Sequence, residues 1–152
     1  MSIKEIDRVI LERMRRWGEP AARVSLFIIF FWFGILKPLG VSAAAPLVVK
    51  TVGWMPVLSG EQWLGVIGWW EVVIGVCFLF RRTTRAAILL LFLQMTGTFM
   101  PLFILPEITF QENGIPFLPT LEGQYIIKNL IIISAALVIG GGLGSKHAPR
   151  VH

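Results

Sequence analysis

Cysteine and histidine are scarce in this chain, and their positions exclude several kinds of redox chemistry. Cys77 is the only cysteine, so the chain cannot build an intramolecular disulfide, a Cys-x-x-Cys pair or a thiolate cluster. Both histidines, His147 and His152, follow the last apolar run, which leaves no imidazole inside a span to bind haem or a transition metal. Any electron carrier must therefore be a ligand or a partner, and Cys77 is expected to be a small buried hydrophobe.

Charged residues are also few, and they are unevenly distributed. They make up 15% of the 152 residues, whereas hydrophobic residues make up 55% and mean hydropathy is +0.74. This composition is too apolar for an ordinary soluble domain, and the charges gather in blocks between long apolar runs. The net charge of +5 does not indicate nucleic-acid binding, because the cations flank the apolar runs and form no stripe interleaved with aromatic residues. The sequence predicts an all-α integral membrane protein whose surroundings are the lipid bilayer.

No cleavable signal peptide and no internal repeat are evident in the sequence. The first apolar run lacks a small-residue cleavage site and ends in Lys37-Pro38, so we expect it to remain as a span. Residues 3–17 place apolar side chains at helical spacing and predict an amphipathic helix on the membrane surface, ended by Gly18 and Pro20. Apolar runs of membrane-crossing length predict a four-helix bundle with spans at about residues 22–39, 62–80, 86–105 and 123–139.

The segments between the predicted spans contain proline and glycine. Residues 41–59 are too short and too broken for a span, and they predict an interfacial or re-entrant element with Trp54 at headgroup depth. Residues 107–120 have the composition of a turn-rich loop, and Thr120 is expected to N-cap the last span. Residues 145–152 form a polar tail.

The cations predict how the protein is oriented. Eleven of the 14 Lys and Arg residues lie before or at the start of the first span, between the second and third, or after the fourth. Lys50 is the only clear cation on the other side. By the positive-inside rule, both termini and the short middle turn are cytoplasmic, and the two longer connections face outward.

Glu71 is the most informative residue. A carboxylate inside a membrane span is energetically costly, so its presence indicates a specific role. Glu71 lies about ten residues, or ~15 Å, from the start of the second span, near the bilayer centre. Gly68 and Gly75 share its helical face, so another helix is expected to pack closely there. If the polar residues of the other spans also face inward, the outer half of the bundle encloses a polar cluster of Lys37, Glu71, Gln94, Thr98 and Lys128.

The charged members of this predicted cluster also have plainer interpretations. Lys37 and Lys128 lie near the ends of their spans and could extend to the interface instead. Glu71 could form an ion pair or a hydrogen bond that only fixes the packing of two helices. No catalytic constellation is complete and no metal ligand set is present in the sequence, so the residues alone do not assign an enzyme.

Three motifs together suggest a family. They are FGILK at residues 33–37, GWWEVVIG at residues 68–75 and LEGQYIIKN at residues 121–129, with GIPFL at residues 114–118 between the last two. Over residues 23–140 the chain resembles the DoxX-like four-helix membrane proteins, most of all the YkgB-like branch.

This resemblance implies a multi-pass protein of the bacterial inner (plasma) membrane. DoxX-like proteins are linked to a membrane thiosulfate:quinone oxidoreductase, to oxidative-stress complexes and to the assembly of other membrane proteins. The YkgB-like branch is linked to resistance against reactive chlorine species. Lys37, Glu71 and Lys128 fall on Lys and Glu positions of the family pattern, which gives them no catalytic role.

Three functions follow as hypotheses. In the first, an outward-facing pocket holds a quinone, a lipid or another small amphiphile, with Glu71 handling a hydrogen bond or a proton and Lys37 or Lys128 anchoring the polar head. In the second, the chain is a non-catalytic membrane subunit or assembly chaperone that recruits a membrane or redox protein. In the third, it is a transporter, which the lack of repeats disfavours and which would need a homo-oligomer. No cofactor is built into any of the three.

Overall fold

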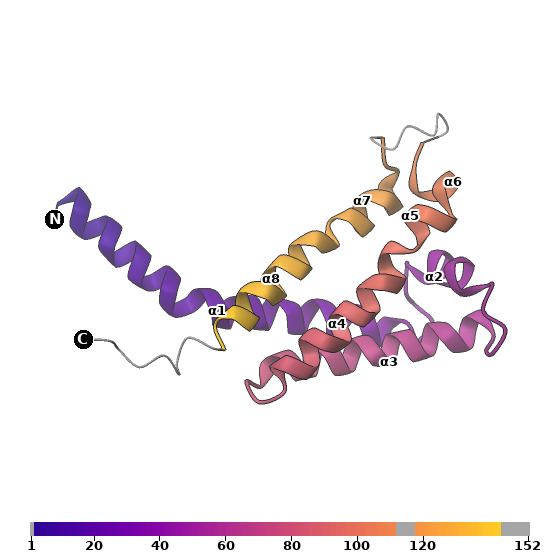
Figure 1. The fold of residues 1–152 in the computed structure, drawn as a ribbon, viewed down its shortest axis with the longest axis horizontal. Coiled ribbons are helices and arrows are strands. Elements are labelled where there is room, and N and C mark those ends of the chain that lie inside the picture. Colours follow the sequence, from indigo (N-terminus) through magenta and orange to yellow (C-terminus); the bar gives the residue numbers. More distant parts are fainter. Residues whose placement is uncertain (1, 112–117, 144–152) are drawn as a thin grey trace.

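The computed structural model describes residues 2–111 and 118–143, and every regular element among them is a helix. Four stretches are long and apolar enough to cross a membrane. The chain is therefore a multi-pass membrane protein, and the predicted all-α fold with four spans is confirmed. The helices (Figure 1) are α1 (Ile3–Leu36), α2 (Ala45–Val52), α3 (Gly60–Leu79), α4 (Thr84–Phe99), α5 (Pro101–Ile104), α6 (Pro106–Thr109), α7 (Leu121–Ile127) and α8 (Asn129–Gly141).

The four long helices pack as a ring around one core. Helix α3 packs against α1 and α4, and α8 closes the ring by contacting both α1 and α4. In a bilayer the helices are held by close packing and interhelical hydrogen bonds, because lipid tails are as apolar as the core. The buried apolar side chains at the centre are Leu26, Phe30, Ile74, Phe78, Ala87, Leu91, Met95, Ala136 and Ile139.

The first helix differs from its prediction, because α1 runs without interruption from Ile3 to Leu36. The predicted break at Gly18 and Pro20 is therefore wrong. Pro20 removes one backbone donor, but helices that enter a membrane tolerate proline when the neighbouring turns keep their hydrogen bonds. Figure 1 shows that α1 changes direction between an N-terminal part, which extends away from the bundle, and a C-terminal part, which lies along α3. We call residues 3–17 the arm, and all of them are exposed.

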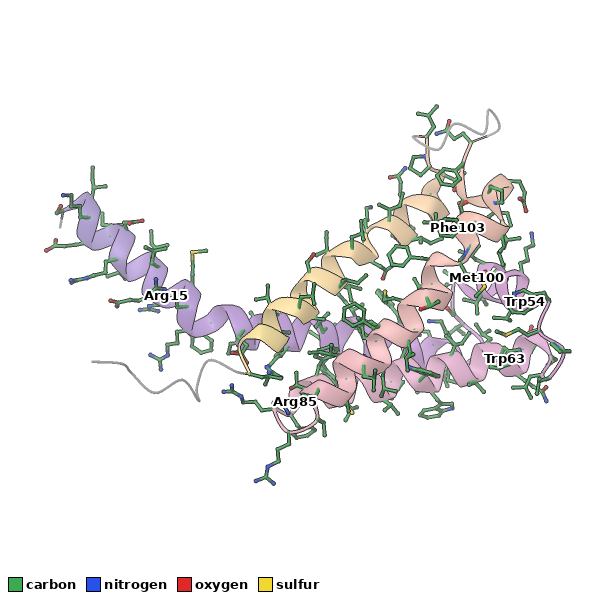
Figure 2. All side chains as sticks on the ribbon, viewed as in Figure 1. Arg15, Trp54, Trp63, Arg85, Met100 and Phe103 are labelled. Carbon is green, nitrogen blue, oxygen red and sulfur yellow. The ribbon has the colours of Figure 1, made fainter. Side chains whose placement is uncertain are left out.

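The two ends of the bundle differ in composition. One end holds the arm, the turn between α3 and α4 with Arg81 and Arg82, and the start of α4 with Arg85. All three arginines are exposed, and we call this end the arginine-rich end. The other end holds α2, α5 and α6 (Figure 1), and we call it the α2 end. Side chains from both ends appear in Figure 2, with Arg15 and Arg85 at the first and Trp54 and Phe103 at the second.

At the α2 end, the segment predicted as an interfacial element contains the short helix α2. Helix α2 packs against α3 and α5 and buries Thr51 and Val52, while Trp54 beyond it is exposed. The following helix α3 begins with a cap, because the Ser59 side chain accepts a hydrogen bond from the Gln62 backbone at 3.3 Å. The segment is thus folded onto the bundle.

The third and fourth spans each contain one interruption. Helix α4 passes into α5 at Met100, just before Pro101, and α7 passes into α8 at Lys128. The predicted N-cap of the fourth span is confirmed, because Thr120 Oγ1 accepts a hydrogen bond from the Gly123 backbone at 3.2 Å. Residues 112–117 of the predicted outer loop and the predicted tail at 145–152 lie outside the described residues.

Candidate functional site

Three of the five predicted polar residues meet inside the bundle. Lys37 is the C-cap residue of α1, Glu71 lies in the middle of α3, and Gln94 lies on α4. The Lys37 ammonium forms an ion pair with Glu71 Oε2, and Gln94 Nε2 donates to Glu71 Oε1 at 2.6 Å. The side chains of Lys37 and Glu71 are only 7% and 13% exposed. We call these three residues the polar lock, because they join α1, α3 and α4.

Glycines on both sides of the contact make the polar lock possible. A Cβ at Gly34 would lie 2.9 Å from the Glu71 Cβ and 2.9 Å from the Gly68 carbonyl oxygen. A Cβ at Gly75 would lie 2.9 Å from the Phe31 backbone nitrogen. Helices α1 and α3 therefore touch backbone to backbone along this face, as small residues allow in membranes. That close approach brings Lys37 within reach of the carboxylate.

The predicted alternative in which Lys37 extends to the interface does not occur. Lys37 is buried, and its ammonium also donates to the Phe33 backbone carbonyl at 3.4 Å. Burying a single unpaired charge carries a large desolvation cost, and the attraction between a buried cation and a buried carboxylate offsets much of that cost. Pairing with Glu71 therefore explains both charges at this depth.

Thr98 lies one turn beyond Gln94 but does not join the polar lock. Its hydroxyl donates to the backbone carbonyl of Gln94 at 3.2 Å, as threonine often does within a helix. The side-chain oxygen Oε1 of Gln94 is buried and has no hydrogen-bond partner among the described residues. The polar lock thus contains one unused acceptor beside a carboxylate whose two oxygens are both engaged.

Lys128 lies outside the polar lock, contrary to its predicted place. Its side chain is exposed, and its ammonium lies 5.2 Å from the centroid of the Tyr125 ring. The buried residues of α7 are Gly123 and Ile126, which lie about 140–160° away from Lys128 around the helix. Lys128 therefore faces away from the bundle, as the plainer interpretation allows.

Two open grooves lie near the α2 end, and neither is lined by any of the five predicted residues. One, of about 500 Å³, is formed by α4 and α5, and the other, of about 590 Å³, lies between α5 and the α2 segment. They share Met100. The first is lined by Phe92, Met95, Thr96, Phe99, Met100 and Phe103, and the second by Lys50, Trp54, Met100, Ile104 and Leu105.

The first groove and the polar lock lie on opposite faces of α4. At ~100° per residue, the groove residues Phe92, Thr96 and Phe99 of α4 lie about 140–160° around the helix from Gln94. Neither of these two grooves is therefore the predicted pocket around the intramembrane carboxylate. In chemical terms the polar lock holds three helices together, and the grooves offer apolar and aromatic walls.

A second polar contact, which was not predicted from the sequence, lies at the arginine-rich end. Arg23 is 7% exposed, and its guanidinium donates to Thr84 Oγ1 at 2.6 Å, to the Phe78 carbonyl at 3.1 Å and to Glu19 Oε1 at 3.0 Å. It therefore joins α1 to the end of α3 and to the start of α4. The spacing of Glu19 and Arg23, four residues apart, was the available signal for the ion pair. Nothing in the sequence indicated the contacts across the bundle.

The described residues hold no group of three or more His, Cys, Asp and Glu side chains that could bind a metal ion. Comparisons with models of protein families, with curated proteins and with solved structures each found no match. The resemblance to DoxX-like proteins therefore stays a prediction that depends on the three motifs, and the fold and contacts of this chain carry the functional argument.

Proposed function

We propose that this chain is a DoxX-like membrane protein that holds a small amphiphile, such as a quinone or a lipid, beside α4 and α5. The observation that carries the proposal is the pair of grooves that meet at Met100. Binding sites for small molecules are concave and mostly apolar, with a few polar groups that fix orientation. The two grooves have this composition, although both are open along one side.

The chemistry of the walls suits a ring or an acyl chain with a polar end. Phe92, Phe99 and Phe103 offer aromatic faces, and Met100 is flexible enough to adapt to different shapes. Thr96 in the first groove and Lys50 in the second offer the polar contacts. A quinone carbonyl can accept from the Lys50 ammonium, and an anionic headgroup can pair with it. The Thr96 hydroxyl donates to the Phe92 carbonyl at 3.4 Å and offers its oxygen as an acceptor. The polar lock then has the separate role of fixing the helices that carry the grooves.

A substitution that fills the grooves tests this binding role. Met100→Trp is expected to lower the amount of quinone or lipid that co-purifies in mild detergent, measured by mass spectrometry of the extract. It should also reduce labelling by a photoreactive decyl-benzoquinone. Val138→Trp is the matched control, because Val138 is an exposed residue of α8 outside both grooves. Equal retention and equal labelling in both variants would refute amphiphile binding at Met100.

The proposed location is the bacterial inner membrane, with the arginine-rich end in the cytoplasm. It is supported by the positive-inside distribution of the cations. With Cys77 replaced by alanine, a single cysteine at Ser2 should resist a membrane-impermeant thiol reagent in intact cells. A single cysteine at Gln111, an exposed residue beyond α6, should react. The opposite labelling pattern would invert the orientation.

The resemblance supports a contribution to redox or oxidant-stress resistance. A strain that lacks the protein is expected to survive hypochlorite less well, and the unaltered chain should restore survival. If the bound amphiphile is needed, Met100→Trp will fail to restore survival while Val138→Trp succeeds. Normal survival of the deleted strain would remove the oxidant-stress part of the proposal without touching amphiphile binding.

A second candidate function is a non-catalytic subunit or assembly chaperone for other membrane proteins. The observation that favours it is the closed polar lock, in which Glu71 has both oxygens engaged and serves helix packing. Native electrophoresis of membranes in mild detergent tests this candidate. A subunit should migrate in a complex that contains a second polypeptide, whereas migration of this chain alone would refute the subunit role.

A further inference from the structure

The arm of α1 presents an apolar stripe that no other part of the described structure covers. Ile3, Met14 and Trp17 are 85%, 65% and 58% exposed, and Ile6 and Ile10 on the same stripe are also exposed. At ~100° per residue these five side chains fall within an arc of about 80°. A stripe of this kind on a polar helix is typical of a helix that lies in a membrane interface.

The polar face of the arm carries more cations than acids. Arg13 lies beside the stripe, about 60° from its centre, and four more cations lie about 120–160° from the centre: Lys4, Arg8, Arg15 and Arg16. Asp7 lies at the other border of the stripe, and Glu5 and Glu12 lie on the opposite face. Long Lys and Arg side chains on the polar face of such a helix can reach the negative phosphates of a bilayer surface.

The arm cations form no ion pair within the described part of the chain. The ion pairs of the described residues are Arg23 with Glu19 and Lys37 with Glu71, both outside the arm. The arm has three acids against five cations, so it is positive overall. Glu5 is engaged with the helix start, because its carboxylate accepts from the Ser2 backbone at 2.8 Å. Arg16 lies over the Trp17 ring at 5.9 Å, a contact that leaves its positive charge uncompensated. The arm therefore offers positive charge to an external partner.

The junction between the arm and the bundle can bend. Pro20 lacks the N–H that would donate to the Arg16 carbonyl, and its ring displaces that carbonyl. A Cβ at Gly18 would meet nothing within 4 Å, so no packing contact requires a glycine there and its effect is to loosen the helix. Figure 1 shows the change of direction of α1 between arm and bundle. The arm is joined to a membrane span without a linker, so a bilayer surface is always within reach.

From the stripe, the cations of the arm and the junction, we propose that the arm docks on a bilayer surface rich in anionic phospholipid. The apolar stripe enters the acyl boundary, the Lys and Arg side chains of the polar face reach lipid phosphates, and the junction that contains Gly18 and Pro20 lets α1 turn from span to surface. This role is independent of what the grooves bind.

The test uses the full chain in vesicles with an environment-sensitive fluorophore on the arm. With Cys77 replaced by alanine, Ile10→Cys carries a nitrobenzoxadiazole label on the stripe. In vesicles of equal phosphatidylcholine and phosphatidylglycerol, the emission should shift to the blue and be quenched by lipids spin-labelled near the headgroup. In pure phosphatidylcholine the shift should be small. Replacing Arg13 and Arg16 by glutamine should lower the ratio of docked to free arm about fivefold for each cation removed.

The matched control removes the same charge from the same end of the molecule. Arg81→Gln with Arg82→Gln should leave the blue shift intact, because these exposed residues lie on the turn and not on the arm. Absence of a shift in phosphatidylglycerol vesicles would overturn the proposal, as would an equal shift in pure phosphatidylcholine. A shift that depends on the protein-to-lipid ratio would also overturn it, because arms would then be covering one another. An unchanged shift in Pro20→Ala would overturn the role of the bend.

Discussion

Gly68→Ala adds one methyl group at the contact between α1 and α3. Its Cβ would lie 2.6 Å from Pro38 Cδ, 2.7 Å from the Gly34 carbonyl oxygen and 2.8 Å from Lys37 Cβ. Distances this short cannot be kept, and one of the contacts is to backbone, so α1 must move away from α3. Overpacking of this kind costs ~1–3 kcal/mol of unfolding free energy. The same movement draws the Lys37 ammonium away from Glu71, so the polar lock weakens as well.

Gly65→Ala is the control, because it makes the same chemical change one turn earlier on α3. A Cβ at Gly65 would meet nothing within 4 Å. Both substitutions gain up to ~1 kcal/mol of helix propensity, so the difference between the variants reports the clash alone. We expect Gly65→Ala to be the more stable variant by ~1–3 kcal/mol.

The measurement is unfolding of the full chain from dodecylmaltoside micelles by increasing sodium dodecyl sulfate, followed by far-ultraviolet circular dichroism. Equal stability of Gly65→Ala and Gly68→Ala would mean that α1 does not approach α3 at Gly68. The close backbone contact that holds Lys37 beside Glu71 would then be refuted.

Three further predictions concern the buried charges, and the same unfolding assay checks each. Lys37→Met leaves the Glu71 carboxylate unpaired and should cost about 3–5 kcal/mol, whereas Lys128→Met, at an exposed site, should change stability by less than about 0.5 kcal/mol; equal losses would refute the pairing. Adding Glu71→Gln to Lys37→Met should restore most of the loss, and additive losses would show that the two residues do not interact. Arg23→Gln should cost about 1–3 kcal/mol by leaving its buried acceptors unsatisfied, and a neutral effect would remove Arg23 from the helix packing.

The fold could be predicted from the sequence because its signal is strong and local. Four apolar runs of membrane-crossing length, separated by charged or proline-containing segments, fix the number of spans. The N-cap at Thr120 is equally local, because the capping oxygen and its backbone donor lie three residues apart. The predicted break at Gly18 and Pro20 was wrong because its signal is not local. A helix continues through proline when the turns on either side keep their hydrogen bonds, and residue preferences alone do not determine whether they do.

Only part of the candidate site could be predicted. Helical spacing placed Gly68 and Gly75 on the face of Glu71, and both lie against α1 in the structure. The partner of Glu71 was not determined, because Lys37 and Lys128 had similar sequence contexts near the ends of their spans. The rotation of each helix decides between them, and that rotation depends on packing across the bundle. The same limit hid Arg23, whose buried acceptors lie 55 and 61 residues away along the chain.

The position of Gln94 separates the polar lock from the grooves and so divides their roles. An intramembrane carboxylate indicates function by default, but that rule assumes a group with capacity left for a ligand. Here Glu71 has one oxygen on a cation and the other on an amide, both from neighbouring helices. The first groove opens on the opposite face of α4. Substitutions in the polar lock should therefore change stability more than amphiphile retention, and Met100→Trp should do the reverse. If Glu71→Gln protein stays folded yet loses the amphiphile as completely as Met100→Trp, the carboxylate belongs to the binding site after all.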